Sequence, residues 1–109
     1  MNWKSRVPLL AGLFVLAATL VAYLRTLTPT VPFWDAGEFI AVSKILGIPH
    51  PPGTPFYVLI GRIFTMLPFG SVAERVNALS AVSGALAVWL TFSTILHLAR
   101  RAFGPEREE

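Results

Sequence analysis

The chain has 109 residues, of which 54% are hydrophobic and only 14% are charged. A soluble domain carries about 25% charged residues, so the composition indicates a membrane protein and argues against a cytosolic one. The absence of cysteine excludes disulfides and thiolate metal sites. The basic residues are scattered along the sequence, which argues against a nucleic-acid partner.

The first apolar segment, Val7 to Leu24, contains no charged residue and is flanked by Lys4, Arg6 and Arg25. Its length is just sufficient to cross a hydrocarbon core of about 30 Å. A cleaved signal peptide has the same basic start and apolar middle, but this run is longer than usual and no small-x-small cleavage motif follows it. We therefore predict a retained transmembrane span over about 7–25.

A second uncharged run, Val76 to Ala99, predicts another span over about 76–99, followed by a tail over 100–109. Ser80 and Gly84 have the small-xxx-small spacing that lets membrane helices pack closely. Such residues are also common in membrane helices generally, but the spacing mildly favours protein partners for this span.

The loop between the spans, about 26–75, predicts two short helices. The first covers Asp35 to Leu46, and the second follows Thr54 and ends near Leu67, before Pro68. Both are too short to cross a bilayer, so they are expected to lie at its surface. The residues assigned to structural turns are Gly37, Pro51, Pro52 and Gly53. The predicted fold class is all-α and integral to the membrane.

The predicted orientation places both termini in the cytoplasm and the loop outside. The basic residues at the outer ends of the spans only slightly outnumber those in the loop, so the positive-inside signal is weak. In a bacterium the membrane would be the inner membrane.

Asp35 and Glu38 are three residues apart and would share one face of a helix. Two carboxylates near apolar surface can differ in pKa, so that one acts as a general base. The same Asp-x-x-Glu spacing is also typical of a helix capping box, which is the alternative explanation. A capped carboxylate can still present an oxygen to a substrate, so the two readings are compatible.

His50 lies in a proline-rich turn that would fix the direction of its imidazole. A single loop histidine is most often a polar turn residue, and a functional role is the second hypothesis. The other histidine, His97, lies inside the second span, so no histidine-based metal site is predicted.

Arg62 lies in the middle of the second short helix, among apolar residues. Such an arginine can extend to lipid headgroups or can bind the phosphate of a lipid-linked substrate. Arg25 and Arg75 are weaker candidates for the same phosphate contact. A transporter is disfavoured, because neither predicted span carries a charged residue that could line a path.

Two motifs within Thr30 to Tyr57 resemble those of a known family. They are Asp-Ala-Gly-Glu at 35–38 and His-Pro-Pro-Gly at 50–53. With its flanking spans the chain, from about 7 to 103, resembles the N-terminal part of a polytopic membrane family catalogued as a domain of unknown function. That family is related to the transmembrane O-mannosyltransferases of the GT-C glycosyltransferase superfamily.

The resemblance implies a span, an external loop with surface helices, and a returning span. It implies that an acidic residue of this loop, Asp35, acts as base toward an acceptor hydroxyl, with Glu38 as its companion and His50 nearby. The donor would be a sugar, possibly mannose, on a polyprenyl phosphate; a divalent metal requirement is left open. The identities of the sugar and the acceptor are also left open.

GT-C enzymes have many more spans than this chain. We therefore expect it to be inactive alone and to require membrane lipid and the remaining transmembrane helices, from a longer polypeptide or a partner subunit. The alternative is a non-catalytic two-span subunit or lipid-binding accessory protein.

Overall fold

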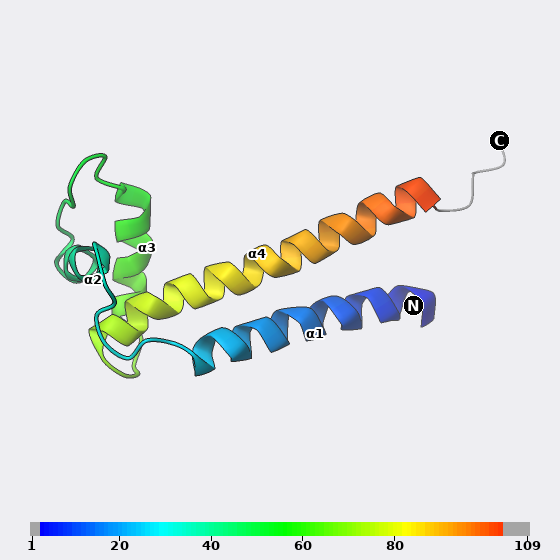
Figure 1. Cartoon of the computed structure of the whole chain (residues 1–109), viewed down its shortest axis with the longest axis horizontal. Helices are drawn as coiled ribbons and strands as arrows, with labels where there is room; N and C mark the ends of the chain where they lie inside the picture. The colour runs from blue at the N-terminus through cyan, green and yellow to red at the C-terminus, as the bar shows by residue number, and fades with distance from the viewer. Residues whose placement is uncertain (1–2, 104–109) are drawn as a thin grey trace.

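A computed structural model describes residues 3–103 of the chain. The described residues form four helices and no strand: α1 (Trp3–Arg25), α2 (Ala36–Ile45), α3 (Pro55–Thr65) and α4 (Val72–Phe103). The two long helices lie side by side and run in opposite directions, and the two short helices gather at one end of this hairpin (Figure 1). The predicted all-α class and the predicted helix order are confirmed.

Helices α1 and α4 are long and apolar enough to cross a membrane, judged by length and composition. Only 6% of the apolar window of α1 and 17% of that of α4 is buried inside the protein. The core helix of a soluble domain would be mostly buried, so these helices need another apolar environment. They pack closely on each other, because a Cβ added at Gly12 would lie 3.2 Å from Nε1 of Trp89.

Helix α4 begins at Val72, four residues before the predicted start of the second span. Its first turn is closed by Ser71 and Glu74: the Ser71 hydroxyl accepts the backbone N–H of Glu74 at 3.2 Å, and the Glu74 carboxylate accepts the N–H of Ser71. This reciprocal arrangement is a capping box. Glu74 and Arg75, which the sequence analysis placed in the loop, therefore belong to the helix.

Helix α2 agrees with its predicted bounds to within a residue, with Asp35 preceding it and Leu46 following it in a left-handed conformation (φ 55°). Gly37 does not form a turn as expected; it lies in the first turn of α2. A Cβ at Gly37 would lie 3.1 Å from Cγ1 of Val31, so the glycine lets the preceding linker approach the helix closely.

The second predicted helix is confirmed as α3, with Pro55 at its first position. The predicted turn before it is also present: the Gly53 N–H donates to the His50 carbonyl at 3.0 Å, across Pro51 and Pro52. Gly53 has a φ of +86°, a conformation that other residues rarely adopt.

The short helices are held on the start of α4 by a small core. Ile40 of α2 packs with Ala73 and Val76 of α4, and Tyr57 of α3 covers this cluster. Helices α2 and α3 meet where Ser43 is fully buried against Gly61, which has no room for a side chain. This packing holds α2 at the end of the hairpin where α1 ends and α4 begins (Figure 1).

Candidate functional site: an acid–histidine cluster

The structure brings Asp35, Glu38 and His50 together. One potential ligand atom from each residue lies within 4.8 Å of those of the other two. Asp35 and Glu38 come from the start of α2, and His50 comes from the turn before α3. The three residues singled out for chemistry from the sequence are therefore neighbours in space.

Glu38 holds the His50 turn with both carboxylate oxygens. Its Oε1 accepts the backbone N–H of His50 at 2.7 Å, and its Oε2 lies 2.7 Å from Nδ1 of the imidazole. With Glu38 ionised, Nδ1 carries the proton and donates it, which leaves Nε2 free to meet a substrate. Two contacts from one carboxylate fix both the backbone and the ring of His50.

This contact couples the ionisation of the two side chains. The hydrogen bond from His50 lowers the pKa of Glu38 below 4.5, because it stabilises the carboxylate. The same hydrogen bond, together with the charges of Glu38 and Asp35, raises the pKa of His50 above 6.5. The contact therefore favours the ionised carboxylate and the protonated imidazole together.

Asp35 does not form the capping box that its spacing allowed. Its side chain makes no cap hydrogen bond, and Glu38 turns to His50 rather than to the backbone of Asp35. The helix-cap explanation is therefore wrong for this pair. Within residues 3–103, the exposed Asp35 carboxylate makes no side-chain hydrogen bond, so it is available to a substrate.

An aromatic contact connects the cluster to α3. The ring of Phe39 lies edge-on to His50, with centroids 5.9 Å apart, and edge-on to Tyr57 at 5.3 Å. Half-burial of Tyr57 raises the pKa of its phenol above 10.0, so it stays protonated at neutral pH. Phe39 thus contacts both the imidazole and Tyr57 of α3.

The same three residues are the set that could hold a cation. Two carboxylates and one imidazole are acceptable ligands for a divalent metal. Each oxygen of Glu38 makes one contact with His50 and keeps a further lone pair, and the cluster adjoins the positive end of α2, which disfavours a cation. The observed contacts are those of an acid–histidine pair, and the donor set is also compatible with a divalent cation.

The three arginines proposed to bind phosphate have different surroundings. Arg62 donates to the carbonyl of Lys44, near the end of α2. Arg75 donates to the carbonyls of Thr65, Phe69 and Gly70, and so holds the connection between α3 and α4. Arg25 is exposed at the end of α1. None of the three belongs to the acid–histidine cluster.

The sequence analysis missed two side chains, one just before α4 and one within it, that fix the linker between α1 and α2 (residues 26–35). Asn77 Nδ2 donates to the carbonyls of Thr28 and Thr30 at 2.9 and 3.2 Å, and the Ser71 hydroxyl donates to the carbonyl of Pro29 at 3.2 Å. The Ser-x-x-Glu capping pattern was available as a signal for Ser71. Nothing local in the sequence distinguishes Asn77.

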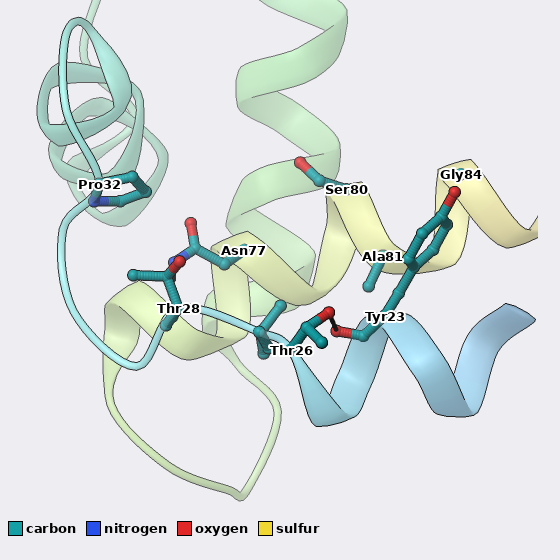
Figure 2. A pocket seen from close by; sticks show the side chains of 9 residues that line it. Tyr23, Thr26, Thr28, Pro32, Asn77, Ser80, Ala81 and Gly84 are labelled. Atoms are coloured by element: carbon teal, nitrogen blue, oxygen red, sulfur yellow. Dashed lines mark hydrogen bonds between the residues drawn. The ribbon is translucent and has the colours of Figure 1, made fainter.

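The linker forms part of the wall of a pocket of about 450 Å³ between the end of α1 and α4. Figure 2 shows its lining, with Tyr23 on one side and Asn77, Ser80 and Gly84 along α4. Tyr23 packs against Gly84, where an added Cβ would lie 2.8 Å from the ring. Most of the pocket lining is apolar, and its polar side chains are uncharged, in contrast to the acid–histidine cluster.

These features define a class of protein: an all-α hairpin of two helices of membrane-spanning length that carries an acid–histidine cluster on short helices at one end. Comparison with known sequences gives the family. The family described as "Protein O-mannosyl-transferase TMEM260 N-terminal domain" matches residues 35–109. The chain belongs to this family.

Two named relatives agree with this assignment. The chain is 39% identical over 98 residues to the mouse protein named "Protein O-mannosyl-transferase TMEM260", covering 89% of this chain and 14% of the relative. It is 33% identical over 95 residues to the Dictyostelium discoideum protein of the same name, covering 84% of this chain and 11% of the relative. The chain thus spans a small part of each relative. No solved structure matches it.

Proposed function

We propose that this chain is the N-terminal part of a membrane glycosyltransferase that moves a sugar, possibly mannose, from a polyprenyl-phosphate carrier to an acceptor hydroxyl. The observation that carries the proposal is the exposed Asp35 carboxylate, uncommitted to a helix cap, beside the Glu38–His50 pair. The names of the relatives support the transferase class and mannose as the sugar.

Asp35 acts as the general base in this proposal. It removes the proton of the acceptor hydroxyl, and the acceptor oxygen forms a bond to the anomeric carbon of the donor sugar. The bond between that carbon and the phosphate oxygen breaks, and the polyprenyl phosphate leaves with the electron pair. Glu38 fixes His50, and His50 borders the site in which the acceptor is held.

The membrane arrangement is part of the same proposal. Helices α1 and α4 cross the bilayer, both termini of the chain lie in the cytoplasm, and α2 and α3 rest on the outer surface. The supporting observation is the steep angle between α3 and α4 (Figure 1), which directs α3 along the membrane surface when α4 crosses it. Exposed apolar side chains on α3, among them Phe56, Leu59 and Ile63, suit that position.

The direct test replaces Asp35 in the native-length protein and measures sugar transfer in isolated membranes. Asp35→Asn keeps the size of the side chain but removes the base, and should lower transfer by at least roughly a hundredfold. Asp35→Ser, which is a good helix cap but no base, should lower it as far. Transfer at the wild-type rate in either variant, at equal membrane abundance, would rule out Asp35 as the base.

The chain is proposed to need further transmembrane helices for activity. An antibody raised against the His50 turn would report the size of the native polypeptide on a blot of source membranes. A band several-fold heavier than 11.9 kDa is expected. A band at 11.9 kDa would instead direct the search to a separate partner subunit.

A further inference from the structure

The linker between α1 and α2 is held in an unusual way. Part of it lines the pocket of about 450 Å³, and Thr28 and Thr30 are exposed. Its fixed points are three consecutive carbonyls, those of Thr28, Pro29 and Thr30, which accept hydrogen bonds from Asn77 and Ser71. Figure 2 shows the Asn77 amide next to Thr28, at the edge of the pocket.

The other end of the linker is fixed against α2. Val31 directly follows the last tied carbonyl, and its Cγ1 would lie 3.1 Å from a Cβ added at Gly37, so it packs closely on the first turn of α2. Gly37 is between Asp35 and Glu38 in the sequence. A displacement of the linker is therefore transmitted through Val31 to the turn of α2 that carries the acid cluster.

From this geometry we infer that Asn77 is a positioning residue for Asp35: its amide ties the linker to α4 and so sets the position of the carboxylate above the outer end of the hairpin. The inference rests on the proposed function, because it assigns to the tie an effect on sugar transfer. Asn77 acts through the linker and does not itself contact the acid cluster.

Asparagine is suited to this role. A single NH₂ group supplies two donors, and here both donors go to backbone carbonyls of the linker. Leucine has a similar shape but no donor, and aspartate has a similar size but only acceptors. Because residues 28–30 are exposed and the linker borders a pocket, little packing is available to replace the lost hydrogen bonds.

The test compares Asn77→Leu and Asn77→Asp with a control, Ser80→Ala. Ser80 lies one turn further along α4 and lines the same pocket, and within residues 3–103 its hydroxyl makes no hydrogen bond. All variants are made in the native-length protein. Should Asn77→Leu fail to fold, Asn77→Asp provides the same comparison.

Two measurements are made on each variant. The first is the distance distribution between spin labels on Phe33→Cys and Leu90→Cys, two exposed positions, with any cysteine outside these 109 cysteine-free residues replaced beforehand. The second is the kinetics of mannosyl transfer from a polyprenyl-phosphate mannose. We expect a broader distance distribution and a kcat reduced roughly ten- to a hundredfold, with KM unchanged, because small misplacements of reacting groups act on this scale. Ser80→Ala should match the wild type in both.

The outcomes separate this inference from the proposed function. An unchanged distance distribution in the Asn77 variants would show that the hydrogen bonds from Asn77 do not hold the linker on α4. A broadened distribution with normal kcat, or with an effect on KM alone, overturns the positioning role even if Asp35→Asn is inactive. If Asp35→Asn is active, the proposed base is wrong, whereas the tie is still judged by the distance measurement.

Discussion

At the scale of single residues, the Glu38–His50 pair is the strongest constraint on the site. One carboxylate holds a backbone N–H and a ring nitrogen twelve positions further along the chain. The pair therefore fixes the turn as well as the imidazole, and it leaves Asp35 as the uncommitted acid of the cluster. This division of roles follows from geometry that spacing in the sequence does not reveal.

The pair should titrate in a direction that NMR of the imidazole can measure. In the native protein, His50 should have a pKa above 6.5, since Glu38 stabilises the imidazolium. Glu38→Gln removes the negative charge and should return the pKa of His50 toward its ordinary value. A pKa of His50 at or below 6.5 in the unaltered protein would contradict the contact.

The same shifts define a pH window for stability. The raised pKa of His50 contributes stability that is fully present below pH 6.5 and lost as the pH rises through the higher native pKa. The lowered pKa of Glu38 contributes stability that is present above pH 4.5 and lost as the pH falls through the lower native pKa. Both contributions are complete between about pH 4.5 and 6.5. The difference in melting temperature between the wild type and Glu38→Gln should therefore be largest in that range and shrink on either side.

At the scale of helices, the contact of α2 with α3 depends on one glycine. A Cβ at Gly61 would overlap the side chain of Ser43, which is fully buried and cannot move into solvent. Gly61→Ala should destabilise the protein by about 1–2 kcal/mol, since the overlap outweighs the gain in helix propensity. Unfolding in detergent micelles, followed by circular dichroism, measures this change.

Gly84→Ala is the matched control. Its added Cβ would also meet a side chain, at 2.8 Å from Tyr23, but that ring is exposed and can rotate away. The substitution should be neutral or stabilising. Equal destabilisation by both alanines would show that close packing at Gly61 is not what holds α2 on α3.

The helices were largely predictable from the sequence, because proline and glycine begin or end a helix through their own backbone conformations. Gly47 and Pro55 marked the limits of the short helices to within about two residues. The predicted start of α4 was several residues too far along the chain, because Glu74 and Arg75 were taken for loop charges. In the structure Glu74 forms a capping box with Ser71, and Arg75 donates to carbonyls at and after the end of α3.

The candidate site was predictable in its membership but not in its contacts. Asp35, Glu38 and His50 stood out as polar residues between apolar segments, and the structure groups them. The partner of Glu38 depends on how the turn folds back over α2, which is a tertiary contact. The tie from Asn77 to Thr28 joins residues 49 positions apart, and no local pattern encodes such a separation.

At the scale of the whole molecule, the hairpin places its two ends far apart along an extent of 59 Å. Ile48, beside the acid cluster, and Phe103, at the end of α4, are both exposed, at 90% and 88%. If α4 crosses the membrane, these two positions lie on opposite sides of it. Helix α4 has 32 residues and so is about 48 Å long, which exceeds a hydrocarbon thickness of about 30 Å.

A labelling experiment tests this arrangement with single cysteines in the otherwise cysteine-free sequence. Ile48→Cys should react with a membrane-impermeant maleimide in intact cells, and Phe103→Cys should react only after permeabilisation. The reverse pattern would place the acid cluster in the cytoplasm and invert the proposed orientation. Reaction of both in intact cells would mean that α4 does not cross the bilayer. In that case, the apolar surface left exposed on α1 and α4 must be covered by protein, and the site would lie away from a lipid-linked donor.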